Sequence, residues 1–300
     1  MKKVIWGVAV LALVLSLTGC CCCCCSSRGE TSSRVVRTIN AGPVERKTYS
    51  ITRDGVEGAD VLLSFGNGEL TLRAGQVDLM EGEFVYNVSE LEPIVEYTTE
   101  ENRGQLSVHP AQAEIRLDRF TEQVRNEWDI QLTKDVPLNL TLSVGDSNVQ
   151  LDLGGLNLTS LDLTAGVADL QVRFDEPNPQ TMDLFDVRTG ASRLEFSQLG
   201  NAHFRSLTFD GGVGTYIFDL SGEWQHSAQV SIKAGASKIT LYVPQDVGVR
   251  LCTGTLRGAD YDGLNEQDGC YVNELYQISD LTLEIELDVG LSDLKVRPKR

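Results

Sequence analysis

Short runs in which apolar and polar residues alternate follow one another along most of the chain. Examples are Asp60–Phe65, Glu69–Arg73 and Glu83–Val88, and glycine-rich turns separate such runs. Alternation with a period of two places successive side chains on opposite faces of a strand. The pattern therefore predicts half-buried strands. Residues 111–125 have irregular apolar spacing, so we expect a long loop there with at most one helical turn.

A longer pattern is superimposed on the alternation: an apolar residue, two residues, glycine, three residues, then two apolar residues separated by one position. It occurs around Gly66, Gly145, Gly166, Gly190, Gly212, Gly235 and Gly290. From Gly145 to Gly235 the successive glycines are 21, 24, 22 and 23 residues apart. Repeats of this length are typical of solenoids, in which each rung buries its apolar face against the next.

The repeat makes predictions for individual positions. The glycine either supplies a positive φ or leaves room where the chain turns between strands. The polar residue between each apolar pair should face outward. Those residues are Thr71, Gln150, Gln171, Glu195, Thr240 and Lys295. Leucine-rich repeats have a similar period, but the ladder asparagine and helical half of that repeat are absent from the pattern.

These observations predict an all-β protein. Its main part is expected to be a β-solenoid of single-stranded, β-helix-like stacked rungs of about 21–24 residues, preceded by an N-terminal β-rich module. We place the N-terminal module at residues 44–127 and the glycine-punctuated solenoid at residues 128–300.

The beginning of the chain resembles a bacterial lipoprotein signal. Lys2 and Lys3 precede an apolar run, Val4–Leu17, which is shorter than the ~20 residues that span a bilayer. Leu17-Thr-Gly-Cys20 then resembles a lipobox. We expect residues 1–19 to be a signal peptide and Cys20 to carry lipid, holding the protein at the extracytoplasmic face of the cell membrane. An ordinary signal peptide or an uncleaved anchor helix is the alternative.

Residues 20–43 are interpreted as a lipidated, cysteine-rich start followed by a flexible tether. Adjacent cysteines pair poorly with one another, and Cys21–Cys25 lack the spacing of a zinc site. The run is therefore interpreted as low-complexity sequence, with intermolecular disulfides or metal capture as alternatives. The remaining two cysteines, Cys252 and Cys270, are predicted to form a disulfide, because export places them in an oxidising compartment.

The formal net charge of −17 argues against nucleic acid as a partner. Only the tail Lys295–Arg300 is locally basic, and it is interpreted as a solvated terminus, with contact to anionic wall polymer or headgroups as the alternative. Asp260, Asp262 and Asp268 could gather oxygen ligands around calcium, but their spacing departs from that of an EF-hand, which favours a solvated acidic loop.

No cofactor and no other metal site is expected. The histidines at 109, 203 and 226 lack metal-ligand spacing. Trp128 and Trp224 could anchor a partner, but both lie in strand-like runs, which favours packing in the core or in a cap.

Several stretches resemble the bacterial toast-rack domain family. They are Asn126–Leu132, Leu151–Leu156, Gly212–Gly214, Asp219–Trp224 and Pro244–Arg250. Residues 44–132 resemble the N-terminal toast-rack module. The family occurs in cell-envelope stress regulators and in proteins described as adhesins, so the resemblance implies a stacked β fold and an interaction role without a catalytic site. The regulators carry transmembrane helices, which a lipid would replace here.

The leading functional hypothesis is a non-enzymatic cell-envelope lipoprotein, either adhesin-like or a structural scaffold. Its partners would be the membrane through the lipid, a cell-wall polymer, another envelope protein or its own copies. One alternative is an accessory sensor of envelope stress that acts through a separate membrane partner. Another is a carbohydrate-active β-solenoid enzyme, which would need clustered acids with Arg or Lys on adjacent rungs.

Overall fold

The computed structural model describes residues 41–112, 124–254 and 259–299. They belong to one compact unit, Thr38–Arg300. The predicted signal peptide, Cys20 and Cys21–Cys25 lie outside the described residues, as does most of the loop expected at 111–125.

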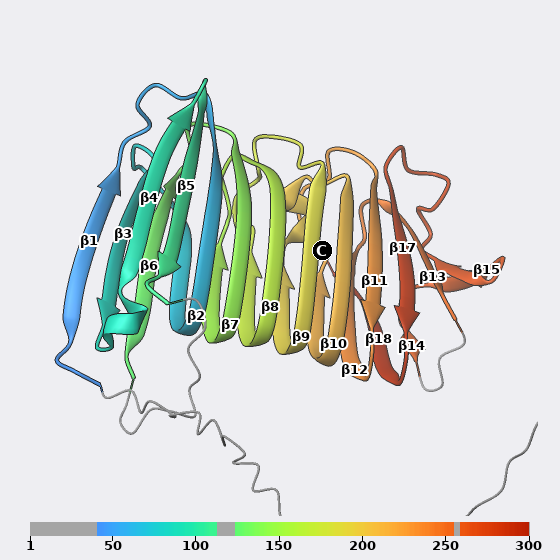
Figure 1. Cartoon of the computed structure of the whole chain (residues 1–300). Helices are drawn as coiled ribbons and strands as arrows, with labels where there is room; N and C mark the ends of the chain where they lie inside the picture. Colours follow the sequence, from blue (N-terminus) through green and yellow to red (C-terminus); the bar gives the residue numbers. More distant parts are fainter. Residues whose placement is uncertain (1–40, 113–123, 255–258, 300) are drawn as a thin grey trace, which may run out of the picture. The chain divides into compact units, whose positions relative to one another are not determined.

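Strands make up 66% of the described residues, and no α-helix occurs among them, which confirms the all-β prediction (Figure 1). The strands are β1 (Glu45–Ile51), β2 (Gly58–Gly75), β3 (Met80–Tyr86), β4 (Pro93–Glu100), β5 (Arg103–Pro110), β6 (Asn126–Thr133), β7 (Leu138–Asp152), β8 (Leu158–Arg173), β9 (Leu184–Ser197), β10 (Ser206–Asp219), β11 (Ala228–Ala234), β12 (Ser237–Pro244), β13 (Gly248–Thr253), β14 (Asp260–Tyr261), β15 (Asn265–Gln267), β16 (Cys270–Val272), β17 (Thr282–Val289) and β18 (Ser292–Lys299). Two short 3₁₀ turns, η1 (Ser89–Leu91) and η3 (Leu199–Ala202), interrupt them.

The long strands bend at the repeated glycine, at the lower edge of Figure 1, so each rung contributes to two sheets. We call these the first-half sheet, before the glycine, and the second-half sheet, after it. In stacking order, rung 1 is β2, rung 2 is β7, rung 3 is β8, rung 4 is β9, rung 5 is β10, rung 6 is β11 with β12, and rung 7 is β17 with β18. All of these pairings are parallel, as in a β-solenoid.

Parallel pairing in register places equivalent apolar residues above one another. One such column runs through the second-half sheet and is buried throughout: Leu70, Val149, Leu170, Leu194, Tyr216, Ile239 and Leu294. A single cluster of buried side chains extends from Ala59 in rung 1 to Val296 in rung 7. The rungs therefore share one continuous core, which is the source of solenoid stability.

The N-terminal strands extend both sheets beyond rung 1. β5 and β6 pair in parallel with the two halves of β2, and β4 and β3 then add in antiparallel orientation, followed by β1. Trp128 on β6 packs edge-on against Phe65 and Phe84, with ring centroids 5.0 and 5.3 Å away. The expected boundary between residues 127 and 128 thus falls within β6, inside the shared core.

The C-terminal strands are out of chain order. β17 and β18 pair in parallel with β11 and β12 on one side and with β13 and β14, which precede them in sequence, on the other. The segment β13–β14 therefore lies outside rung 7, and the antiparallel hairpin β15–β16 adds to its edge. β17 and β18, the last strands in the sequence, are therefore interior strands, and β14 and β15 form the edge among the described residues.

Buried asparagines satisfy the turns that close the rungs opposite the glycines. The Asn178 side chain accepts a hydrogen bond from Leu158 N and donates to Leu158 O, both at 2.8 Å. Asn201 donates to Phe174 O at 2.7 Å and accepts from Glu223 N at 2.8 Å. The sequence analysis did not single out these two asparagines, whose role is to pair with buried turn carbonyls and amides.

Candidate functional site

The outer faces of the two sheets carry polar side chains in registered columns. None of Thr71, Gln150, Gln171, Glu195, Thr240 and Lys295 is buried, as predicted. These six residues stack on the second-half sheet, with Ile217 of rung 5 in the same column. Because adjacent strands lie about 4.8 Å apart, each column presents groups at a fixed spacing.

Hollows on the outer face of the second-half sheet lie between β1 and β9. Others lie over β2, β4, β5 and β7 on the first-half sheet, about 480 Å³, and beside the C-terminal strands, about 570 Å³. One hollow of about 400 Å³ lies over β1, β3 and β6 and includes Arg73, Asp129 and Gln131. A second, of about 190 Å³, continues across rungs 1–3 and includes Arg73, Gln150 and Gln171. Arg73 belongs to both, so the two hollows adjoin. We call this region, between β1 and rung 3, the hollowed face.

The hollowed face alternates in charge. Arg73, Asp152 and Arg173 occupy the same register position on rungs 1, 2 and 3. Arg73 Nη1 also lies 2.6 Å from Asp129 Oδ1 on β6. Guanidinium, carboxylate and amide groups in such rows can donate and accept hydrogen bonds along an extended polar ligand.

A larger hollow of about 670 Å³ lies nearer the glycine bends of rungs 1–4. Its lining includes Glu69, Asn148, Asp169 and Arg193, which stack at one register position on successive rungs. It adjoins the hollowed face on the same sheet.

The glycine column has a steric function. None of the seven repeated glycines adopts a left-handed φ, so the positive-φ explanation was wrong. Instead each glycine from rung 2 to rung 7 faces the backbone oxygen of the glycine one rung below. The Cβ of an alanine would lie 2.9 Å from that oxygen at Gly190 and 3.2 Å from it at Gly290. Glycine therefore recurs because it leaves room between bends.

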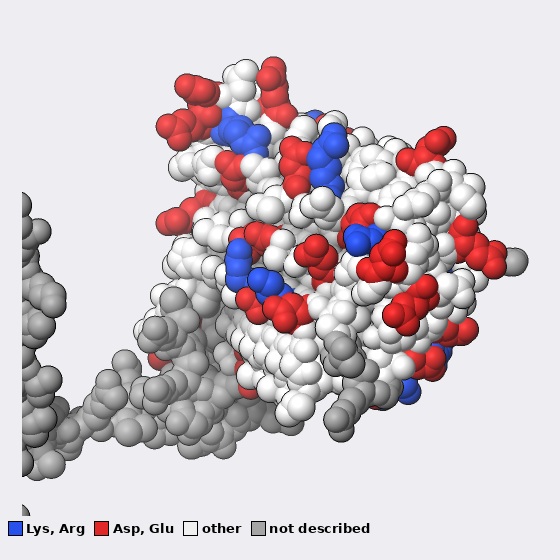
Figure 2. All heavy atoms as spheres, turned by 90° about the vertical axis from the view of Figure 1, so that its right-hand side faces the viewer, with Lys and Arg blue, Asp and Glu red and all other residues white. Residues whose placement is uncertain are grey.

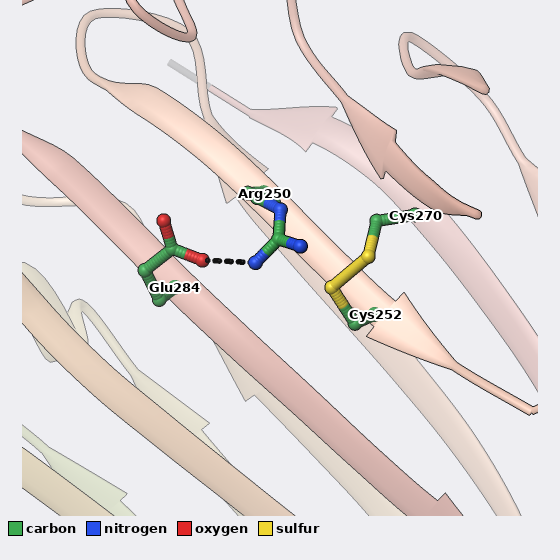
Figure 3. Close-up of a disulfide and its surroundings, with 4 residues drawn as sticks. All are labelled: Arg250, Cys252, Cys270 and Glu284. Atoms are coloured by element: carbon green, nitrogen blue, oxygen red, sulfur yellow. Dashed lines mark hydrogen bonds and ion pairs between the residues drawn. A yellow bond between two sulfur atoms is a disulfide. The ribbon is translucent and has the colours of Figure 1, made fainter. Parts of the chain in front are cut away.

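The predicted disulfide between Cys252 and Cys270 is present (Figure 3). It joins directly opposed residues of β13 and β16, with Cα atoms 4.4 Å apart. Arg250, two residues before Cys252, contacts Glu284 of β17 at 3.0 Å. The two interactions attach the β15–β16 hairpin to β13, and β13 to rung 7.

Of the aspartates considered for calcium, Asp260 and Asp262 lie near Arg297, and Asp268 lies near Arg250. Asp260 pairs with Arg297, Nη2 to Oδ2 2.6 Å, so its charge is already neutralised. Among the described residues, no group of three or more His, Cys, Asp or Glu side chains is arranged to hold a metal ion. Figure 2 shows the C-terminal end of the molecule, where acidic side chains are spread over the surface and basic ones lie among them.

The histidines and tryptophans have structural positions. His203 is buried in a turn, with Nδ1 2.6 Å from Asn178 O, whereas His109 and His226 contact backbone oxygens nearer the surface. Trp128 is only 2% exposed. Trp224 is partly buried against the core and donates to Leu220 O at 2.9 Å. Core and cap packing of both tryptophans is thus confirmed.

An ion pair between a buried aspartate and an exposed lysine, which the sequence pattern did not reveal, ties β18 to β10. Lys299 Nζ lies 2.7 Å from Asp219 Oδ2, whose side chain is 5% exposed. Burial by itself would raise the pKa of Asp219, but hydrogen bonds from Lys299 and Ser221 outweigh it, so the pKa lies below its ordinary value. The only sequence signal was an acid at the end of a repeat, followed two residues later by serine.

Comparison with known proteins places the chain in a family. A family model described as the N-terminal domain of toast_rack (DUF2154) matches residues 40–185 and, a second time, residues 178–242. The match therefore continues well beyond the 44–132 region in which the resemblance to this module was expected. No curated protein matches the chain. In the described residues, no helix is long and apolar enough to cross a membrane.

Several solved structures are similar to the chain at low sequence identity. A candidate cell adhesion protein from Clostridium sporogenes is 21% identical with a TM-score of 0.49, covering 86% of this chain and 100% of its own. A candidate adhesin from Bacteroides fragilis is 11% identical with a TM-score of 0.35, covering 86% and 99%. A candidate lipid binding protein from Parabacteroides distasonis is 9% identical with a TM-score of 0.31, covering 86% and 98%. On the family match, the chain belongs to the toast-rack N-terminal domain family.

Proposed function

We propose that this chain is a non-enzymatic interaction protein of the bacterial cell envelope, anchored by lipid at Cys20 and contacting its partner through the hollowed face. The observation that carries the proposal is the pair of adjoining hollows that share Arg73 on the outer side of the second-half sheet. The lipobox-like Leu17–Cys20 supports the anchor.

The chemistry of this face suits an extended polar partner. Gln150 and Gln171 stack in register, and the Arg73–Asp152–Arg173 row runs beside them. Groups that repeat at strand spacing can bind successive units of a polymer or an exposed protein segment, each contact being weak. A shallow face offers many such contacts without enclosing a small molecule. We therefore propose a cell-wall polymer or another envelope protein as the partner.

Site-specific photo-crosslinking in intact cells tests the contact surface. A photo-crosslinking residue placed at Gln171 of the full chain should form adducts with an envelope component. The matched control is the same residue at Thr208, which is also exposed but lies on the first-half sheet. Equal adducts at both positions, or none at Gln171, would contradict the proposal. Mass spectrometry of the adducts distinguishes polymer from protein.

Two further experiments test the anchor and the non-enzymatic role. Cys20→Ser should shift the protein from the membrane fraction to the soluble fraction of lysed cells, because the sulfur that receives the lipid is gone. Retention in the membrane fraction would count against lipid anchoring. The purified chain should release no product from wall polysaccharide with or without calcium, and any release that the protein catalyses would favour the enzyme alternative.

A further inference from the structure

The glycine bends form an exposed corner where the two sheets meet. The residue after each bend glycine points outward on rungs 3–7, and we call this row the corner ridge: Val167, Ala191, Val213, Ala236 and Leu291. Its large members are among the most exposed apolar side chains of the described residues: Val167 is 57% exposed, Val213 61% and Leu291 88%. Exposed apolar side chains that are contiguous, rather than scattered, mark interaction sites.

Size and charge alternate together along this ridge. On rungs 4 and 6 the ridge residue is alanine, and on rungs 5 and 7 it is the larger Val213 or Leu291. Each ridge residue is flanked by one residue on either sheet. The flanking pairs are Arg188 and Arg193 on rung 4, Asp210 and Thr215 on rung 5, Lys233 and Lys238 on rung 6, and Asp288 and Asp293 on rung 7. Small apolar residues thus lie between bases, and large ones lie beside acids.

The flanking charges are available for a partner. All seven charged residues of the four pairs are exposed. Within the described part of the chain, only Arg188 forms an ion pair, with Asp162 and Asp186 on the outer face of the first-half sheet. The other six have no counter-ion within ion-pair distance among the described residues.

We propose that the corner ridge binds the corner ridge of a second copy of this chain, with the two solenoids antiparallel. A two-fold axis that crosses the ridge between rungs 5 and 6 brings rung 4 against rung 7 of the other copy, and rung 5 against rung 6. Leu291 then fits over Ala191, and Val213 over Ala236. Such a two-fold interface is self-complementary, because each contact occurs twice.

The same operation pairs opposite charges. Because the axis keeps first-half sheet against first-half sheet, Arg188 meets Asp288, and Asp210 meets Lys233. On the other side Arg193 meets Asp293, and Lys238 meets the neutral Thr215. On rungs 4–7 each large ridge residue faces a small one, and no like charges face each other, which favours both affinity and register.

Other arrangements of two ridges are unfavourable. In a parallel arrangement each rung faces its own equivalent, so bases meet bases on rungs 4 and 6, and acids meet acids on rung 7. In an antiparallel arrangement whose two-fold axis passes through rung 5, rung 4 lies against rung 6. Basic side chains then face basic side chains again. Like-charge contacts of this kind cost binding energy. The charge pattern therefore selects an antiparallel arrangement with the axis between two rungs, and the axis between rungs 5 and 6 is the one that brings all four charged rungs, 4 to 7, against opposite charges.

The corner ridge is a single row of residues, and a contact along it buries less area than the ~800 Å² per partner of a standard stable interface. We therefore expect a reversible dimer that depends on concentration. Anchoring of both copies at one membrane would raise their effective concentration. The pairing uses the corner and leaves the hollowed face free, so it does not depend on the function proposed above.

Cysteine pairs in the full chain test the geometry. Ala191→Cys with Leu291→Cys should give a disulfide between copies, identified by mass spectrometry of mixed ¹⁵N-labelled and unlabelled protein. Within one copy these positions are three rungs, or about 14 Å, apart, beyond the reach of a disulfide. Each single variant is the matched control, because equivalent positions of the two copies are equally far apart. A 191–291 link no more abundant than background, or efficient links in the single variants, would overturn the proposal.

Sedimentation velocity over a concentration series supplies a second readout. Leu291→Asp should abolish the dimer, whereas Ile278→Asp, at another exposed apolar residue, should not. Lys233→Asp should weaken association because it then opposes Asp210, and adding Asp210→Lys should restore it. Dimerisation unchanged by Leu291→Asp, or a charge-swapped double variant as weak as the single one, would contradict the pairing.

Discussion

At the scale of single residues, the column of bend glycines determines how closely rungs can stack. Gly212 approaches Gly190 so closely that a Cβ would overlap its backbone oxygen, whereas a Cβ at Gly66, on rung 1, would meet no atom within 4 Å. The same motif residue therefore has different steric surroundings at different rungs.

Gly212→Ala should consequently reduce the free energy of unfolding by about 1–3 kcal/mol, the usual cost of overpacking. Gly66→Ala should be neutral or stabilising by up to about 1 kcal/mol, because alanine restricts the unfolded chain. Urea unfolding followed by circular dichroism measures both. Equal effects of the two substitutions would contradict the steric explanation.

The recurrence of these glycines was readable from the sequence, but its cause was not. A positive φ and a close approach both favour glycine. The two explanations differ in what lies next to the glycine on the neighbouring rung. The sequence of one repeat does not show this, because it depends on the register between rungs. Asn178 and Asn201 were missed for a similar reason, since their importance comes from the turn amides and carbonyls that surround them in the folded chain.

The Asp219–Lys299 pair predicts a dependence of stability on pH. The pKa of Asp219 is lowered in the folded protein, so its contribution is present above the unfolded value, ~3.9, and is lost as pH falls through the folded value. Asp219→Asn should cost about 1.5–3 kcal/mol at pH 7, the range for hydrogen bonds to charged groups. The difference from the unmodified chain should shrink below about pH 4.

Urea unfolding at a series of pH values from 7 to 3 measures this effect. A destabilisation that stays constant over that range would show that the Asp219 carboxylate does not contribute through its charge. Glu286→Gln, at an exposed acid for which no ion pair is found among the described residues, is the control and should show little effect at any pH.

At the scale of elements, the departure from chain order at the C-terminus is the main feature that sequence reasoning did not anticipate. The motif around Gly290 matches the others, so it predicts a rung. It does not predict which strands pair with that rung. β13 and β14 come earlier in the chain but pair outside β17 and β18. A repeat defines what each rung buries, whereas the connecting segments determine the order.

The disulfide, by contrast, was predictable from two cysteines and the expectation that the chain is exported. Replacing both with Cys252→Ser and Cys270→Ser should release the β15–β16 hairpin, since the link stabilises by about 3 kcal/mol in the loop-entropy description. Hydrogen exchange should then accelerate at Tyr271 in β16 and stay unchanged at Leu163 in β8. Unchanged protection of β16 would show that strand pairing alone holds the hairpin.

At the scale of the whole molecule, one core and two outer faces follow from the repeat, and the family match covers residues 40–242. The fold class and the outward columns were predicted because they depend on local alternation. The hollowed face and the corner ridge were not, because both arise from side chains that stacking brings together from rungs some twenty residues apart.

The stacking order is most directly tested by a disulfide placed across it. Ser237 and Ser292 are opposed on β12 and β18, with hydroxyl oxygens 2.9 Å apart. Ser237→Cys with Ser292→Cys should form an internal disulfide, found by peptide mapping. Ser192→Cys with Ser237→Cys, two rungs or about 10 Å apart, should not. Formation of the first link without the second is the result this account predicts; absence of the 237–292 link in oxidised, folded protein would contradict it.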